Sequence, residues 1–319
     1  MGEVAALCCG LSGLVTHTIC KNKSLRSLNV QLCNCILAAP KAIAYKIFGE
    51  SLTEAIHKVK KKLYQLLIEL TNSLPVSKLI MKFAQSKVSR FIVPSYANYF
   101  KVDVTEIDQD LKSFKSLQQF FVRNLKPEAR IFNNDDTTIL SPVDAIVEQF
   151  GSITANNNIV VKNQSYSIKG MLGNDKSVSK YIGGSFLVLY LSPSHYHRIH
   201  SPINGKIINQ YPLGSNSYPV NKLGLTLGNS PLAQNYRVIT EMKEKDGSHV
   251  AVVKVGAMFV NTIEELAQPS QRLKKGEELA YFSFGSTVVL LFEKGKTKFN
   301  SNIKVNQEIK AGEVLVLKI

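Results

Sequence analysis

The sequence predicts an α+β fold, in which N-terminal basic amphipathic helices pack on a β-rich, sandwich-like body. Apolar residues recur at helical spacing in the first part of the chain, whereas short β-branched runs bounded by Gly, Asn and Pro dominate the second. The chain has 319 residues, 45% hydrophobic and 20% charged, as expected of a globular protein with a sizeable core. We expect three regions, at 1–50, 51–130 and 131–319.

The first region is an acid-poor leader or anchor. From Val4 to Gly49 there is no acidic residue, and basic residues are interspersed with Ser, Thr and apolar residues. This composition is typical of an organelle transit segment, and an interfacial anchor would share it. Pro40 and Lys41 interrupt the most apolar stretch, so a transmembrane helix is not predicted. All five cysteines lie in this region, which argues against a fold held by disulfides.

The second region contains two basic amphipathic segments. Residues 51–72 begin with a Ser51 and Glu54 capping box and continue with apolar residues at helical spacing. Beside that apolar face lies a cluster of lysines: Lys58, Lys60, Lys61 and Lys62. A second basic segment follows Pro75, and no acid occurs between Glu69 and Asp103. Such helices either cover a core or lie in a membrane interface, where each basic side chain contributes roughly 1 kcal/mol on an anionic surface.

The net charge narrows the class of partner. The chain has 39 Lys and Arg against 24 Asp and Glu, a formal charge of +15, which favours a polyanionic partner. The sequence shows no zinc-ligand spacing, no aromatic RNA-binding strand and no Trp. We therefore expect an anionic membrane surface as the partner and no nucleic acid, and we interpret 51–130 as membrane-associating.

The third region is predicted to be a β-sandwich of related halves. Two of its segments echo each other, Ser141-Pro142-Val143-Asp144 and Ser201-Pro202-Ile203-Asn204, and each resembles a turn that begins a strand. A further turn with the pattern Lys310-Ala311-Gly312-Glu313 lies near the C-terminus.

A cluster of histidines follows an apolar run in this body. His195, His197 and His200 lie within six residues of one another. Histidines two apart on a strand share a face and could bind a metal. Because no acidic or cysteine ligand lies nearby and Arg198 would repel a cation, no metal site is predicted. Histidine is instead suited to acid/base catalysis, because its ordinary pKa is near 6.5. At least one of these three histidines is expected only to form a hydrogen bond at the turn.

A second candidate site is the pair Gly285 and Ser286, which precedes an apolar strand. Most such pairs are simple turns, but glycine leaves its carbonyl open to attack by the hydroxyl that follows. The histidine cluster supplies the base that this serine needs. Asp144, in its own turn, is a candidate to orient the imidazole, in the chain order Asp, His, Ser.

Four motifs, in order along the chain, resemble those of the phosphatidylserine decarboxylase family. They are Phe120-Phe121-Val122-Arg123, Ser141-Pro142-Val143-Asp144, Tyr196-His197-Arg198-Ile199-His200 and Phe284-Gly285-Ser286-Thr287. The resemblance runs from about residue 74 to the C-terminus, and its last two motifs are highly specific as a pair. Three positions depart from the family pattern, namely Ala145, Ala280 and Tyr236, and none of them is a proposed catalytic residue.

The resemblance implies a proenzyme that cleaves itself between Gly285 and Ser286 into chains 1–285 and 286–319, which stay associated. His200, held by Asp144, would deprotonate Ser286, and Ser286 would become a pyruvoyl cofactor. This group would form a Schiff base with phosphatidylserine, and His197 would supply or position the proton that Cα takes up after CO₂ leaves. The product would be phosphatidylethanolamine, in phospholipid biosynthesis.

Two other functions remain open at this point. A serine hydrolase acting on lipid would use an uncleaved Ser286, but such enzymes usually place the nucleophile in a Gly-x-Ser-x-Gly elbow. A non-catalytic lipid-binding sandwich would explain the charge but not the histidines. The resemblance favours a peripheral membrane protein of a bacterial inner (plasma) membrane or of the mitochondrial inner membrane.

Overall fold

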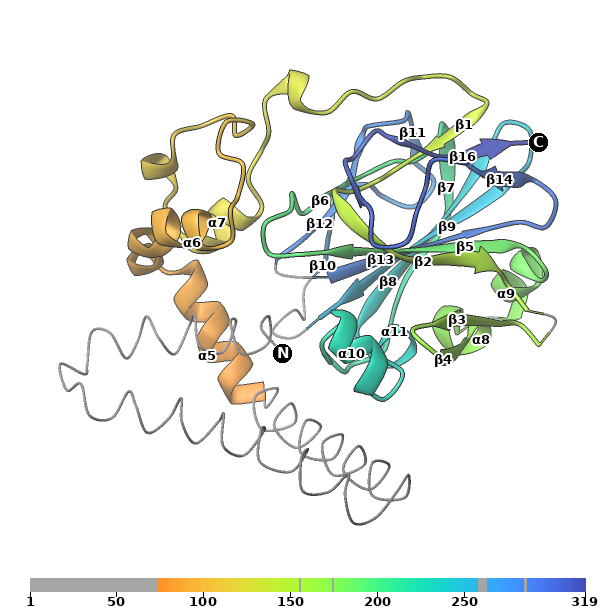
Figure 1. Cartoon of the computed structure of the whole chain (residues 1–319), viewed down its shortest axis with the longest axis horizontal. Helices are drawn as coiled ribbons and strands as arrows, with labels where there is room; N and C mark the ends of the chain where they lie inside the picture. The colour runs from red at the N-terminus through yellow and green to blue at the C-terminus, as the bar shows by residue number, and fades with distance from the viewer. Residues whose placement is uncertain (1–73, 155, 174, 258–262, 284–285) are drawn as a thin grey trace, which may run out of the picture. The chain divides into compact units, whose positions relative to one another are not determined.

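The computed structural model describes residues 74–319, apart from 155, 174, 258–262 and 284–285. Figure 1 shows helices preceding a β-rich body, so the predicted α+β class is confirmed. The leader at 1–50, the helix expected at 51–72 with its lysine cluster, and Gly285 lie outside the described residues. Region boundaries at 50 and 130 stay predictions.

The helical region forms a small core of its own. Its elements are α5 (Leu74–Gln85), η1 (Lys87–Ile92), α6 (Val93–Tyr99), η2 (Leu111–Ser113), α7 (Leu117–Phe121) and η3 (Pro127–Ala129). Ser116 caps α7 by accepting a hydrogen bond from the Gln119 N–H at 3.1 Å. Phe114 and Phe120 meet edge to face, with ring centroids 5.2 Å apart. Within the described part of the chain, no helix has the length and hydrophobicity to span a membrane.

An eight-stranded antiparallel sheet forms the centre of the body, in the order β11-β7-β8-β9-β13-β5-β2-β15. Its strands are β2 (Ala145–Ser152), β5 (Ser185–Leu191), β7 (Gly205–Leu213), β8 (Arg237–Glu244), β9 (His249–Gly256), β11 (Arg272–Leu273), β13 (Ser286–Phe292) and β15 (Glu308–Ile309). Strand β13 pairs with both β5 and β9 along its whole length, and all of its residues are buried. A strand covered on both faces explains the continuous apolar run in the sequence.

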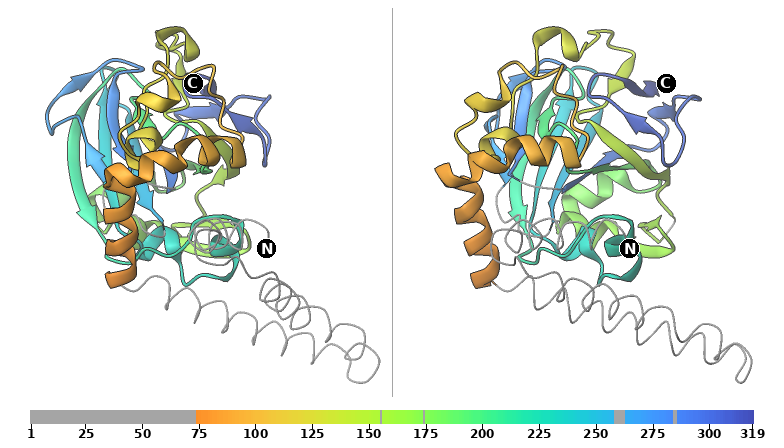
Figure 2. Two further views of the ribbon diagram at one scale, coloured as in Figure 1. Left: turned by 90° about the vertical axis from the view of Figure 1, so that its left-hand side faces the viewer. Right: turned by 60° about the vertical axis from the view of Figure 1, so that its left-hand side comes forward.

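Different elements cover the two faces of the large sheet (Figures 1 and 2). One face packs against two small sheets, β10 (Ile263–Glu265), β12 (Glu278–Phe282) and β6 (Arg198–His200), and β1 (Thr138–Leu140), β16 (Val314–Lys318) and β14 (Thr297–Phe299). The other face packs against β3 (Asn158–Val161), β4 (Gln164–Ser167), α8 (Ile168–Leu172), α9 (Asp175–Tyr181), α10 (Lys222–Leu227) and α11 (Pro231–Gln234). Because side chains alternate along a strand, Ser286 shares the first face with Val288 and Leu290.

The two Ser-Pro turns that echo each other in the sequence also have the same local structure. The hydroxyl of Ser141 donates to the carbonyl two residues later at 2.6 Å, and that of Ser201 does the same at 2.7 Å. The turns contact each other, because the His200 N–H donates to the Pro142 carbonyl at 2.8 Å. The sequence echo therefore corresponds to a structural repeat.

A Gly-Glu turn is hydrogen-bonded to each of these serines. The Gly312 N–H donates to the Ser141 carbonyl at 2.9 Å, and the Gly276 N–H donates to that of Ser201 at 3.0 Å. Gly312 has a φ of +92°, and a Cβ there would lie 2.2 Å from the carbonyl oxygen of Ile131. This turn therefore requires glycine for both its conformation and its space.

Replacing Gly312 with alanine is expected to destabilise the protein more than replacing Gly247, although the two glycines have similar φ angles. Gly247 has a φ of +89° and nothing within 4 Å of the added Cβ, so backbone strain of about 1–3 kcal/mol is the main cost. Gly312→Ala adds the collision with Ile131. Urea denaturation of both variants measures the difference, and equal free energies of unfolding would contradict this account.

Candidate active site

Ser286 begins the central strand β13 and is fully buried. Its neighbours across the sheet are Leu191 at the end of β5 and Gly256 at the end of β9. Its Oγ has no hydrogen-bond partner among the described residues. Buried hydroxyls nearly always have one, so an unpartnered hydroxyl at this position calls for a functional explanation.

The topology brings the histidine loop alongside this serine. Strand β5 of the large sheet leads through His195 and His197 into β6, while β12, the partner of β6, precedes β13, the partner of β5. Both connections therefore cross between the same two sheets. Two contacts hold these connections together. In the large sheet Ser286 pairs with Leu191, and at the small sheet the Phe282 N–H donates to the His197 carbonyl at 3.0 Å.

His197 is a buried, neutral imidazole with one free nitrogen. Its Nδ1 lies 2.8 Å from the His195 carbonyl, and since a carbonyl only accepts, Nδ1 carries the proton. Nε2 is then the basic nitrogen, and it is buried without a partner among the described residues. Burial is the main cause that lowers the pKa of His197 well below its ordinary value, and the positive Arg123 adds to it. The Phe121 ring packs on the imidazole, with centroids 3.9 Å apart.

His200, the last residue of β6, has the same tautomer. Its Nδ1 donates to the Gly276 carbonyl at 2.7 Å, which leaves Nε2 to accept from the Tyr196 hydroxyl at 3.0 Å. Burial lowers the pKa of His200 below its ordinary value. Both of the histidines predicted to be catalytic are therefore bases when the surrounding solution is near neutral pH.

Asp144 lies in the turn between β1 and β2, and its carboxylate is bound by groups other than histidine. Arg130 donates to it from Nε at 2.7 Å and also from Nη2, and the Ala311 N–H donates at 2.9 Å. No hydrogen bond between Asp144 and His200 occurs in the described structure. The negative charge of Asp144 still acts at longer range, where it raises the pKa of His200 and so opposes the effect of burial. The direct orienting bond expected from the sequence stays a prediction.

His195 has a role in holding the loop. Its Nδ1 accepts from the Ser192 N–H at 3.0 Å, so the proton is on Nε2, which donates to Glu308 at 3.0 Å. This bond ties the loop to β15, on the C-terminal side of the expected cut. In the described part of the chain, no group of three or more His, Cys, Asp or Glu side chains is arranged to hold a metal.

Arg123 and Tyr196 are site residues to which the sequence assigned no role. The buried Arg123 follows α7 and donates from Nη2 to the carbonyls of Ser194 and His195, at 2.9 and 3.1 Å. It thereby fixes the part of the loop whose His195 carbonyl accepts the hydrogen bond from His197. Both residues belong to the recognised motifs, and that was the only signal in the sequence.

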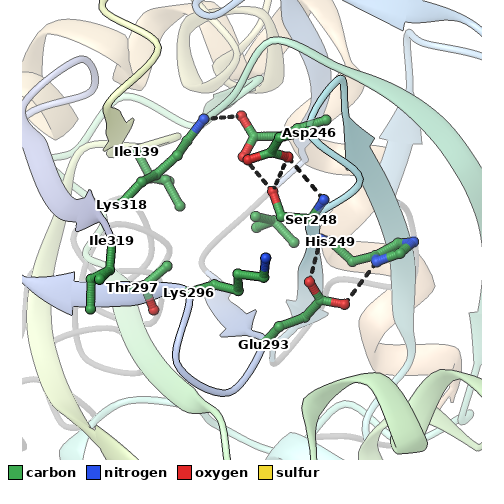
Figure 3. Close-up of a pocket in the computed structure, with 11 residues that line it drawn as sticks. Ile139, Asp246, Ser248, His249, Glu293, Lys296, Thr297, Lys318 and Ile319 are labelled. Atoms are coloured by element: carbon green, nitrogen blue, oxygen red, sulfur yellow. Dashed lines mark hydrogen bonds and ion pairs between the residues drawn. The ribbon is translucent and has the colours of Figure 1, made fainter.

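A small charged pocket lies far from this site, beyond the other end of β13 (Figure 3). Its charged groups are largely paired with one another: Lys318 binds Glu244, and His249 binds Glu293 at 2.8 Å. Since a strand rises about 3.3 Å per residue, the seven residues of β13 put about 20 Å between this pocket and Ser286. It is therefore separate from the candidate active site.

Comparisons with known proteins show to which family the chain belongs. The family description phosphatidylserine decarboxylase matches residues 117–317. A phosphatidylserine decarboxylase proenzyme of Geobacillus sp. (strain WCH70) is 51% identical over 253 residues, covering 79% of this chain and 97% of that protein. One from Bacillus thuringiensis (strain Al Hakam) is 46% identical over 261 residues, covering 82% of this chain and 99% of that protein. The chain therefore belongs to the phosphatidylserine decarboxylase family, and the class of enzyme expected from its sequence is confirmed.

Proposed function

We propose that this protein cleaves its own chain between Gly285 and Ser286 and then decarboxylates phosphatidylserine to phosphatidylethanolamine and CO₂. The observation that carries the proposal is the buried, unpartnered hydroxyl of Ser286 at the start of the central strand, next to the histidine loop. A serine hydrolase with an intact Ser286 finds no support, because Ser286 begins a strand and not the strand-to-helix elbow of that class.

Self-cleavage would begin with attack of Ser286 Oγ on the carbonyl carbon of Gly285, as the hydroxyl proton passes to an imidazole. His200 is the proposed base, because the resemblance assigns it this role and its Nε2 is unprotonated, accepting a hydrogen bond from Tyr196. The amide becomes an ester, and loss of the Cα proton then breaks the Cβ–Oγ bond and frees residues 1–285. Hydrolysis of the remaining dehydroalanine releases ammonia and leaves a pyruvoyl group. General base catalysis of roughly 10²–10⁴-fold suffices for a step that occurs once per molecule.

The site fits the pyruvoyl group, because the Oγ that the change removes has no hydrogen-bond partner among the described residues and residue 286 lies at a strand start. The group would supply a carbonyl that accepts the substrate amine and withdraws electrons from its Cα. The chain supplies the proton transfers. Neutral His197 Nε2 can take a proton from the substrate ammonium, which makes the amine nucleophilic, and can return it to Cα after CO₂ leaves.

The sheet explains why the two chains would stay together after cleavage. The new chain, 286–319, begins with β13, which is hydrogen-bonded to β9 on one side and β5 on the other. Cutting before Ser286 leaves the pairing of residues 287–292 with both neighbouring strands in place.

The helical region offers a surface for an anionic membrane. Three large apolar side chains are well exposed on it, Leu79 at 69%, Val88 at 65% and Phe91 at 70%. The exposed basic residues Lys87 and Arg90 lie in the same stretch. Apolar side chains next to basic ones suit insertion at a charged lipid interface. We place the protein at the surface of a bacterial inner membrane or of the mitochondrial inner membrane.

Ser286→Ala and His200→Ala should each leave the chain whole. The native protein should run as two fragments on a denaturing gel, whereas each variant should run as one chain of 35.4 kDa, and intact mass spectrometry should show a blocked N-terminus on the native 286–319 fragment. His249→Ala, in the remote pocket, is the control and should be cut normally. An active native preparation made of intact chains only would refute self-cleavage.

His197→Ala should be cut normally but should decarboxylate roughly 10²–10⁴-fold more slowly. Normal cutting would itself show that the variant folds. In the native enzyme, the pKa of His197 lies below its ordinary value of 6.5, so its basic form persists at pH 6.5. The decarboxylation rate should therefore stay level as the pH is lowered to 6.5 and fall only below it. Full activity of His197→Ala would remove this residue from the proton transfers.

Replacing Val88 and Phe91 together with serine should weaken binding to vesicles that contain anionic lipid, because apolar area is lost from the interface. Co-sedimentation measures the binding. Val160→Ser is the matched control, since Val160 is also exposed but lies on β3. Unchanged binding of the double variant would exclude this surface as the membrane contact.

A further inference from the structure

A cluster of charged side chains, buried at Arg130 and Asp144, joins segments that are far apart in the sequence. Arg130 binds Asp144 and also Glu106 at 2.8 Å, and Glu106 binds Lys310 at 2.6 Å. The side chains of Arg130 and Asp144 are only 7% and 9% exposed. The cluster therefore links the helical region, the segment after it, the first turn of the body and the C-terminal segment.

The C-terminal segment reaches Asp144 through a backbone group. The Ala311 N–H donates to Asp144 Oδ1 at 2.9 Å, so the carboxylate accepts one bond from this segment in addition to those from Arg130. Two backbone bonds hold the same turn: the Ser141 N–H donates to the Glu313 carbonyl at 2.7 Å, and the Gly312 N–H donates to the Ser141 carbonyl at 2.9 Å. Asp144 is thus fully held only when residues beyond the expected cut have docked.

The repeat gives His200 an equivalent support. Its Nδ1 donates to the carbonyl of Gly276, in the Gly-Glu turn that corresponds to the turn at Gly312. The Gly276 turn therefore holds His200 through a carbonyl, and the Gly312 turn holds Asp144 through the Ala311 N–H. These are the two side chains that are expected to act together. Only the Gly312 turn lies downstream of Ser286.

We propose that Arg130 is a positioning residue for self-cleavage, which holds Asp144 beside the docked C-terminal turn so that the chain is cut only after residues 286–319 have folded into place. The proposal rests on the proposed function. It solves a physical problem of self-cleavage, because a chain cut before β13 and this turn had docked would release its C-terminal fragment.

The position of the Asp144 carboxylate depends strongly on the charge of Arg130. A buried carboxylate that loses its bidentate guanidinium is left with an uncompensated charge, which favours a turn of the side chain toward water. Such a turn would displace the negative charge that raises the pKa of His200. The other groups that interact with the charge of Asp144 are Arg123 and Tyr196, while Glu106 and Lys310 act through Arg130.

The test follows the conversion of newly translated full-length chain into its two fragments. Arg130→Ala should slow the conversion roughly 10–100-fold, the loss expected when a catalytic group is misplaced. Free guanidinium at sub-denaturing concentration should restore part of the rate, since it can replace the bidentate donor.

Two further variants make the outcomes distinct. Arg272→Ala, at an exposed position on β11, is the control and should be cut at the native rate. Arg130→Lys, which keeps the charge but not the bidentate geometry, should be slow and folded, and it carries the test if Arg130→Ala does not fold. Native-rate cutting of a folded Arg130 variant would overturn the inference, as would slow cutting of Arg130→Ala that free guanidinium does not restore. If the native chain is itself never cut, the proposed function fails and not this inference alone.

Discussion

The pairing of β13 with β5 and β9 is the constraint on which the rest of the structure depends. It places Ser286 at the middle of the largest sheet, buries it on both sides and sets its side chain toward the small β10-β12-β6 sheet. The same pairing puts the start of the loop after β5 beside the start of β13. The strand order alone therefore brings the loop that contains His195 and His197 to the strand that begins with Ser286.

Burial and hydrogen bonding together decide the chemical state of the histidines. In His197 and His200 a backbone carbonyl accepts a hydrogen bond from Nδ1–H, which keeps the proton on Nδ1 and leaves Nε2 as the base. In His195 a backbone N–H binds Nδ1 and reverses the tautomer. Three histidines within one short motif thus have two different roles, and the difference comes from the backbone groups that face each ring.

Local patterns predicted much of this structure. The apolar run after Ser286 predicted a buried strand, the two Ser-Pro turns predicted a repeat, and the motifs identified the family. The binding of Asp144 by Arg130 could not be predicted in the same way, because Arg130 lies in irregular chain and meets its partner only through tertiary contacts. The tautomers could not be predicted either, since they depend on which backbone group faces each ring in the folded chain. The role of Asp144 beside His200 stays a prediction.

The central position of β13 also bears on the lifetime of the enzyme. A dissociable cofactor can be replaced when it is damaged, whereas a group formed from residue 286 is part of a strand with neighbours on both sides. Under the proposed function, replacing it would require the sheet to open and a new strand to enter. Each molecule would then have a single cofactor for its whole working life, and a side reaction that consumed it could be repaired only by synthesis of a new chain.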